Sequence, residues 1–126
     1  MNESANKPNG AGIGRILKAG ACSLKGLKAV YQHEAAFRQE LLLCLLLVPV
    51  AILLAKTALG LSLMLFGLGL ILLVEVLNSA IEAVVDRIGL EHHELSGRAK
   101  DLGSLAVLMS LILCACLWMG VLSSAR

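Results

Sequence analysis

Three long apolar runs constrain this chain more than any other feature of its sequence. They cover residues 41–55, 58–85 and 99–122, and short polar segments separate them. A helix needs about 20 apolar residues to cross the ~30 Å hydrocarbon core of a bilayer. The first run reaches that length only if residues 34–40 join it. We therefore expect membrane-spanning helices over residues 34–55, 58–85 and 99–122.

The composition agrees with a membrane protein. Of the 126 residues, 58% are apolar and 16% are charged, whereas a typical soluble domain carries about 25% charged residues. This length allows one domain, so residues 1–126 are expected to form a single membrane domain. The net charge of +2 gives no reason to expect a nucleic-acid partner. Three of the four cysteines lie inside apolar runs without CxxC spacing, which argues against a disulfide framework or a zinc site.

The segment before the first run is amphipathic. Residues 1–12 are polar and are expected to be flexible, whereas residues 13–31 mix apolar side chains with Arg15, Lys18, Lys25 and Lys28. This pattern is typical of a helix that lies on an anionic membrane surface. A short cytosolic helix packed on its neighbours is the alternative. The predicted fold class is an all-α membrane protein with three transmembrane helices and an N-terminal amphipathic surface helix.

The second run ends in a polar face. At ~100° per residue, one side of this helix collects the side chains of Glu75, Asn78, Ser79, Glu82 and Asp86. Ionisable groups inside a membrane helix are costly, so they indicate a functional site by default. Two other interpretations stay open: a polar seam that holds helices together, and a proton or ion pathway.

Basic residues are distributed unevenly along the chain. Six precede the first run, one lies between the first and second runs, three lie between the second and third, and one ends the chain. The positive-inside rule places the N-terminus and the second connection in the cytoplasm, and the C-terminus on the periplasmic side. Glu75 lies 18 residues after Thr57, which is roughly 27 Å along a helix. The acidic face therefore emerges at the cytoplasmic boundary, opposite Lys56.

The connection at residues 86–101 is polar. Gly89 is expected to end the second helix and Ser96 to cap the third. Ala99 and Gly103 form a small-xxx-small pair that suits close helix contact. His92 and His93 are more simply explained as a solvated turn than as metal ligands.

Carboxylates beside basic groups suit a nucleotide that carries magnesium. Magnesium prefers a few carboxylates together with phosphate oxygens and water, and Arg15, Arg98 and Lys100 could neutralise phosphate charge. Glu75 is the deepest acid and suits a general base, whereas Glu82 lies nearer water and suits a metal ligand. The sequence contains neither a GxxxxGK[ST] loop nor a protein-kinase glycine loop, so a kinase here would belong to neither common class.

Three segments resemble a known family. They are residues 34–40 (EAAFRQE), 75–87 (EVLNSAIEAVVDR) and 93–101 (HELSGRAKD). In order and spacing, residues 13–122 are similar to the bacterial integral-membrane diacylglycerol kinases. The resemblance implies a homotrimer in the bacterial inner membrane, with composite sites between subunits. It also implies Mg²⁺-dependent transfer of the ATP γ-phosphoryl group to sn-1,2-diacylglycerol, which gives phosphatidic acid.

The resemblance further implies a role for each matching residue. Glu75 would be the catalytic base with Asn78 in support, and Glu34 and Glu82 would hold magnesium. The residues expected to contact ATP are Arg15, Glu34, Glu82, Glu91, His92, His93, Lys100 and Asp101. Those expected to contact the lipid substrate are Arg15, Ala19, Ser23, Ala36, Phe37, Arg38, Gln39, Glu40, Glu75 and Ser104.

The chain departs from the family pattern at a few positions. Cys22, Leu24 and His92 stand where aromatic residues are common, and residues 54–57 replace an acidic turn. Three alternative functions follow from the residues and the resemblance. They are an undecaprenol kinase, a small proton-coupled membrane transporter that uses Glu75, and a purely structural membrane protein.

Overall fold

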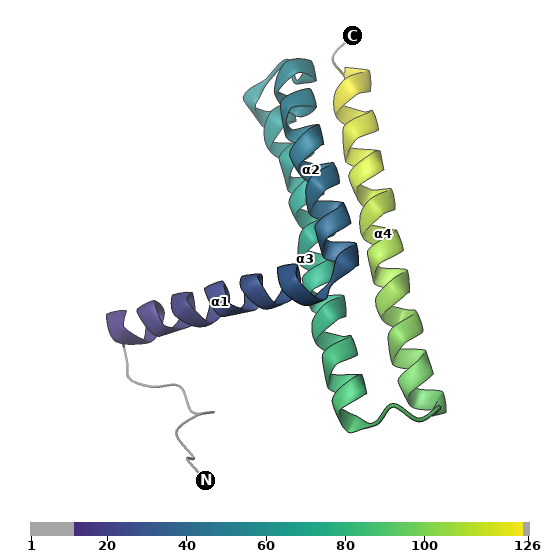
Figure 1. Cartoon of the computed structure of the whole chain (residues 1–126). Helices are drawn as coiled ribbons and strands as arrows, with labels where there is room; N and C mark the ends of the chain where they lie inside the picture. Colours follow the sequence, from purple (N-terminus) through teal and green to yellow (C-terminus); the bar gives the residue numbers. More distant parts are fainter. Residues whose placement is uncertain (1–11, 125–126) are drawn as a thin grey trace. The chain divides into compact units, whose positions relative to one another are not determined.

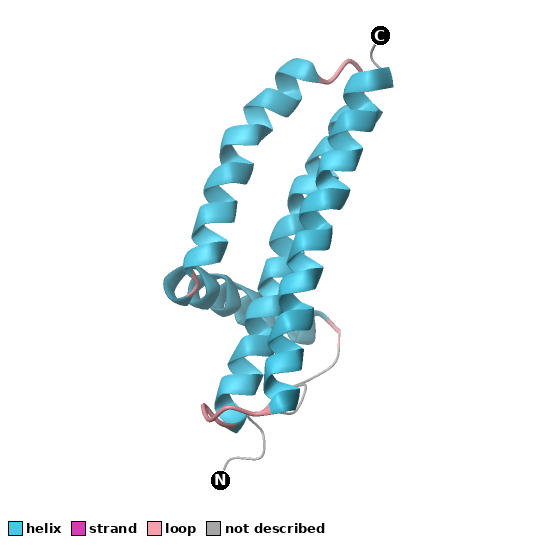
Figure 2. Cartoon of the chain, turned by 90° about the vertical axis from the view of Figure 1, so that its right-hand side faces the viewer, coloured by secondary structure: helices cyan, strands magenta, loops and turns pink. Residues whose placement is uncertain are grey.

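The computed structural model describes residues 12–124, which form four α-helices (Figures 1 and 2). The helices are α1 (Ile13–His33), α2 (Ala35–Leu54), α3 (Ala58–Ile88) and α4 (Glu94–Ser124). Helices α2, α3 and α4 are each long and apolar enough to cross a membrane. The predicted all-α fold with three spanning helices is confirmed. The predicted flexible segment, residues 1–12, lies outside the described residues except for Gly12.

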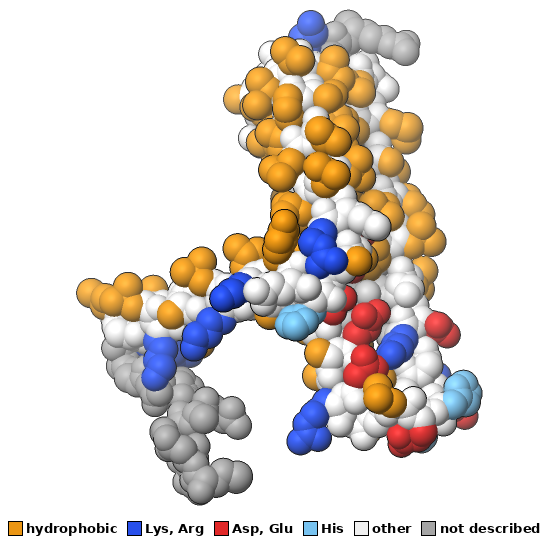
Figure 3. All heavy atoms as spheres, in the orientation of Figure 1, with side chains coloured by type: hydrophobic (Ala, Val, Ile, Leu, Met, Phe, Trp, Pro, Cys, Tyr) orange, Lys and Arg blue, Asp and Glu red, His pale blue; other side chains and the backbone are white. Residues whose placement is uncertain are grey.

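The chain divides into two compact units, Met1–Glu34 and Ala35–Arg126, whose positions relative to one another are not determined. Helix α1 begins after Gly12, which has a positive φ of 70°, and it ends where the Glu34 N–H donates to the Val30 carbonyl at 3.0 Å. Hydrophobic side chains line one side of α1 and Lys and Arg side chains line the other (Figure 3). The helix is therefore amphipathic, as predicted.

In the second unit, α3 packs against both α2 and α4, and more extensively against α4. The apolar core consists of two clusters of buried side chains. One contains Cys44, Leu68, Ile71 and Cys114, and the other contains Ala51, Met64 and Val121. Trp118 packs against both clusters, and its indole N–H donates to the Met64 carbonyl at 3.2 Å.

Glycines bring α3 and α4 close together. A Cβ at Gly60 would lie 3.1 Å from Cγ1 of Val121, and a Cβ at Gly67 would lie 2.9 Å from Sγ of Cys114. Gly103 of α4 is buried in the same interface. Close helix contact at Gly103 is therefore confirmed, and two glycines of α3 contribute to it as well.

Local hydrogen bonds of Thr57 and Gly89 define the two ends of α3. Thr57 caps α3, because its hydroxyl oxygen accepts the Gly60 N–H at 3.0 Å, so α2 and α3 form a tight hairpin. At the other end of α3, the Gly89 N–H donates to the Val85 carbonyl at 3.2 Å. Gly89 thus ends the helix, although α3 continues to Ile88 rather than stopping at residue 85.

The predicted start of the last helix was wrong. The helix begins at Glu94, not at residue 99, and Ser96 lies inside its first turn rather than at its cap. His93 does the capping instead: its Nδ1 accepts the Leu95 N–H at 3.0 Å, and its carbonyl accepts the Gly97 N–H at 2.9 Å. The apolar pattern marks only the part of the helix that is apolar, whereas the helix itself continues beyond it.

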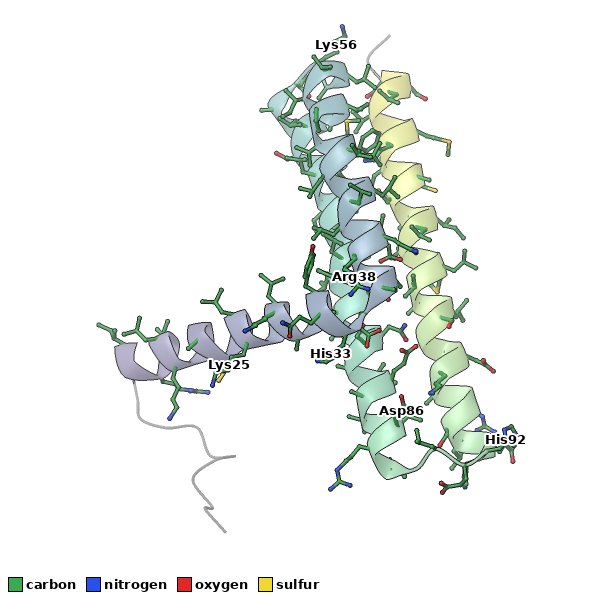
Figure 4. All side chains as sticks on the ribbon, viewed as in Figure 1. Lys25, His33, Arg38, Lys56, Asp86 and His92 are labelled. Carbon is green, nitrogen blue, oxygen red and sulfur yellow. The ribbon has the colours of Figure 1, made fainter. Side chains whose placement is uncertain are left out.

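Polar and apolar side chains separate along the second unit. Many large apolar residues of α2, α3 and α4 are exposed, such as Leu53 at 81% and Leu59 at 70%, which suits contact with lipid or protein. Acidic side chains gather at the end that carries the α3–α4 connection (Figure 3). Lys56 lies at the end opposite Asp86 and His92 (Figure 4), as the predicted topology requires.

Candidate active site

The polar face of α3 is turned inward. The exposed fraction is 4% for Glu75, 8% for Asn78 and 9% for Ser79. Glu82 is half-buried and Asp86 is exposed, so the face runs from a buried carboxyl to a solvated one. A buried carboxyl group is costly unless another group hydrogen-bonds or pairs with it.

The partner of Glu75 is a second carboxyl group. Glu40 on α2 is hydrogen-bonded through its side chain to Glu75 on α3. A hydrogen bond between two carboxyl groups needs a proton on one of them. The other oxygen of Glu40, Oε2, is buried and accepts no hydrogen bond from the described part of the chain. Glu40 was predicted as a lipid-contacting residue, and the structure places it directly beside the predicted base.

Asn78 lies between Glu75 and Glu82 on the polar face of α3. Its Nδ2 donates to Oε1 of Glu82 at 3.4 Å. Its Oδ1 is buried without a hydrogen-bond donor among the described residues, as is the hydroxyl of Ser79. The Oδ1 atom lies against Gly103 of α4. Asn78 is therefore fixed by one hydrogen bond and by close contact with a neighbouring backbone.

The α3–α4 connection forms a small polar cavity. Its volume is about 190 Å³, and its lining includes Glu91, His92, His93 and Lys100, all predicted to contact ATP. Nζ of Lys100 lies 2.8 Å from Oδ1 of Asp86, which joins α4 to α3 across the cavity. Two further predicted contacts, Asp101 and Ser104, are exposed on the next turns of α4.

The remaining predicted site residues lie at the start of α2 or in the first unit. Ala36, Arg38 and Gln39 are exposed at the start of α2, whereas the side chain of Phe37 is buried with 3% exposed. The predicted residues of the first unit are Arg15, Ala19, Ser23 and Glu34. Of these, Ser23 donates its hydroxyl to the Ala19 carbonyl at 2.9 Å, and Glu34 is half-buried where α1 ends.

The pattern of helices and polar residues matches a known family. Residues 21–122 match the family described as prokaryotic diacylglycerol kinase. The chain belongs to this family. The resemblance that the sequence motifs indicated is therefore confirmed. The matched range contains α2, α3, the polar cavity and almost all of α4, whereas Arg15 and Ala19 precede it.

Individual relatives agree with the family match. The protein named diacylglycerol kinase from Escherichia coli (strain K12) is 53% identical over 110 residues, which cover 87% of this chain and 90% of that protein. Proteins of the same name from Pseudomonas aeruginosa and Haemophilus influenzae are 48% and 43% identical over 111 residues. Those matches cover 88% of this chain and 90% and 94% of the respective relatives.

The carboxylates of this diacylglycerol kinase family member suit a metal ion that binds together with the phosphate groups of a substrate. Among the described residues, no three His, Cys, Asp or Glu side chains gather closely enough to hold a metal ion. Glu82 offers carboxylate oxygens at the half-buried end of the face. Magnesium is commonly held by one or two carboxylates together with substrate phosphates. The residues present suit that mode better than an all-protein cage.

Two residues at this site were not assigned a role from the sequence. Asp86 was placed on the polar face, but its pairing with Lys100 was not predicted, although both helices were expected to meet at this connection. Gly103 was expected to aid helix packing, not to contact Asn78. Its position opposite Asn78 depends on how α3 and α4 are aligned, which residue spacing does not reveal.

Proposed function

We propose that this chain transfers the γ-phosphoryl group of ATP to the free hydroxyl of sn-1,2-diacylglycerol and yields phosphatidic acid and ADP. Family membership supports this reaction, as do relatives of that name along most of the chain. The observation that carries the proposal is the buried Glu75, which shares a hydrogen bond with Glu40 where the apolar part of the membrane-length helix α3 gives way to its polar face. A lipid hydroxyl and a soluble nucleotide can meet only at such a boundary.

In this mechanism Glu75 accepts the hydroxyl proton of diacylglycerol. The lipid oxygen forms a bond to the γ-phosphorus as the bond from that phosphorus to the β–γ bridging oxygen breaks, and ADP leaves. Such transfers depend mainly on positioning and on charge neutralisation. Glu40 limits the orientations available to the Glu75 carboxyl, and any proton that the pair shares must be on Glu40 when Glu75 acts as a base.

The nucleotide would be held at the polar cavity. Lys100 contributes positive charge, and Arg15, Glu91, His92, His93 and Asp101 complete the proposed ATP contacts. Glu34 and Glu82 would hold Mg²⁺, which neutralises phosphate charge when it is bound. Asn78 donates to Oε1 of Glu82 at 3.4 Å and so orients the carboxylate that would hold the metal. The lipid contacts are the residues proposed from the family resemblance, at α1, the start of α2 and Ser104.

The assembly we propose is a homotrimer with sites shared between subunits, in the bacterial inner membrane. Glu40 Oε2, Asn78 Oδ1 and Ser79 Oγ are buried without a hydrogen-bond partner among the described residues. Buried polar atoms normally have partners, so the Glu40 and Ser79 oxygens are suited to groups from a substrate or another subunit, whereas Asn78 Oδ1 packs against Gly103. The N-terminus would be cytoplasmic and the C-terminus periplasmic, since Lys56 lies at the end opposite the α3–α4 connection, which Arg87, Arg98 and Lys100 flank.

The test is phosphate transfer from labelled ATP in mixed micelles. Diacylglycerol and undecaprenol would be compared as acceptors, with and without magnesium. We expect magnesium-dependent labelling of diacylglycerol. If undecaprenol alone is labelled, the phosphoryl transfer is as proposed but the lipid acceptor is undecaprenol rather than diacylglycerol. If folded protein labels neither lipid but carries protons across the membranes of vesicles, the transporter interpretation of Glu75 replaces the kinase.

A further inference from the structure

Gly103 differs from the other glycines of the α3–α4 interface. A Cβ at Gly67 would meet the apolar core residue Cys114, and a Cβ at Gly60 would lie 3.1 Å from Cγ1 of Val121 and 3.2 Å from the hydroxyl oxygen of the capping residue Thr57. A Cβ at Gly103 would overlap Oδ1 of Asn78 and would lie 3.1 Å from its Cγ. At this position alone among the described glycines, the missing side chain makes room for a polar group of α3.

The space at Gly103 determines where the Asn78 carboxamide can lie. Oδ1 occupies the volume that any larger residue at 103 would fill, and Asn78 is 8% exposed. With Oδ1 seated there, Nδ2 points along α3 and donates to Oε1 of Glu82 at 3.4 Å. A methyl group at position 103 would force the carboxamide to rotate or α4 to move away. Rotation of the carboxamide would break its hydrogen bond with Glu82, whereas a shift of α4 would remove the backbone contact that holds the carboxamide in this orientation.

We propose that Gly103 is a positioning residue: its bare backbone seats the carboxamide of Asn78, which in turn orients the carboxylate of Glu82. The role of Glu82 in this statement rests on the proposed kinase function. The seating of Asn78 does not, because it follows from contacts within the chain. The rival explanation is ordinary close packing of α3 and α4, of the kind seen at Gly67.

The chain offers two matched controls. Gly67→Ala adds a methyl group to the same interface, against Cys114 and away from Asn78. Gly120→Ala adds one to α4 where a Cβ would have nothing within 4 Å. Gly103→Ala is the test variant, and Asn78→Ala removes the group that the seat would hold.

The first measurement uses no substrate. The side-chain amide signals of the full-length protein, labelled with ¹⁵N-asparagine in detergent micelles, are recorded by NMR. The signals of Asn78 are those missing from Asn78→Ala. We expect them to shift in Gly103→Ala and to stay in place in Gly67→Ala and Gly120→Ala. Unshifted signals in Gly103→Ala would overturn the proposal even if the protein proves to be an active kinase.

The second measurement is kinetic. Gly103→Ala is expected to lower kcat about tenfold and to raise the magnesium concentration for half-maximal rate, with the KM for diacylglycerol within about twofold of its original value. In the Asn78→Ala background, Gly103→Ala should have almost no further effect, because the two residues act as one unit. Additive losses would show that Gly103 acts through general packing.

Failure to fold also has a defined meaning. If Gly103→Ala alone does not fold, the double variant Gly103→Ala/Asn78→Ala should recover a folded protein, because the overlap is with Asn78. A double variant that also fails to fold would overturn the proposal. Absence of kinase activity in the unmodified protein, with the expected NMR shifts, would reject the proposed function and leave the seating of Asn78 intact.

Discussion

Lys100 on α4 forms an ion pair with Asp86 on α3, with 2.8 Å between Nζ and Oδ1. Both side chains are about half exposed, at 45% and 48%, so the pair is screened by salt and contributes little to stability. Its importance lies in its place. It crosses the polar cavity where ATP is proposed to bind, and Asp86 competes with phosphate for the ammonium group.

Asp86→Asn is therefore expected to strengthen ATP binding. The substitution removes a negative charge beside the phosphates and releases Lys100 to meet them. We expect the KM for ATP to fall about two- to threefold at low ionic strength, with the difference shrinking as salt increases. Lys100→Met should raise that KM. An equal KM for the original protein and Asp86→Asn across salt concentrations would show that Lys100 does not contact the nucleotide.

Glu75→Gln should abolish turnover while ATP still binds. The amide cannot accept the hydroxyl proton, and loss of a general base costs about 100-fold or more in rate. Binding of Mg-ATP, measured by isothermal titration, should persist. Glu94→Gln is the matched control, since Glu94 is an acid on α4 with its side chain 85% exposed and paired only with Arg98 in the contacts described here. Loss of ATP binding in Glu75→Gln would contradict its role as base.

Glu34→Gln and Glu82→Gln should each raise the magnesium requirement. Each removes a carboxylate that is proposed to hold the metal, so more free Mg²⁺ is needed to populate the complex. The measurement is rate against magnesium concentration at saturating ATP, with Glu94→Gln again as control. A pair of unchanged titration curves would eliminate both residues as ligands.

His93→Ala should loosen the start of α4. The substitution removes the imidazole nitrogen that accepts the Leu95 N–H at 3.0 Å, and loss of an N-cap costs about 1 kcal/mol. A lower thermal unfolding temperature in detergent is expected, together with a raised KM for ATP. His93→Asn restores a capping acceptor and should recover stability. The neighbouring exposed His92 serves as control: His92→Ala should leave the unfolding temperature unchanged.

Trp118→Phe should destabilise the protein without altering its kinetics. It removes the indole N–H that donates to the Met64 carbonyl at 3.2 Å, at a cost of about 1 kcal/mol. Trp118 lies near the C-terminal end of α4, more than four helical turns from Lys100. Thermal unfolding and kcat are the measurements. A kcat that falls as much as that of Glu75→Gln would contradict the separation of core and site.

Sequence reasoning predicted the fold well because the bilayer imposes a length on apolar segments. The three spans and the end of α3 at Gly89 follow from that constraint and from local turn chemistry. The start of α4 was misplaced because Leu95 is the single large apolar residue among residues 94–98, so apolar periodicity gives no signal there. His93 also resembles a solvated turn residue until its Nδ1 is seen to accept a backbone N–H.

The candidate site was predicted in part. Glu75, Asn78 and Glu82 share a face because helical geometry fixes their angles. The contacts of Glu40 with Glu75, Asp86 with Lys100 and Gly103 with Asn78 each join two helices. Such pairings depend on the rotation and alignment of whole helices, which no spacing within one segment specifies.

The bonds between α3 and α4 also restrict how these helices can move. Trp118 holds the carbonyl of Met64 near one end of the pair, and Lys100 holds Asp86 near the other. Sliding one helix past the other by a single turn, ~5.4 Å, would break the hydrogen bond of Trp118 and drive side chains into Gly60 and Gly67, whereas the exposed Lys100–Asp86 pair adds little to this restraint. Any motion that accompanies turnover must therefore keep the register of α3 against α4 and take place elsewhere, through tilting of the pair as a whole or displacement of its neighbours.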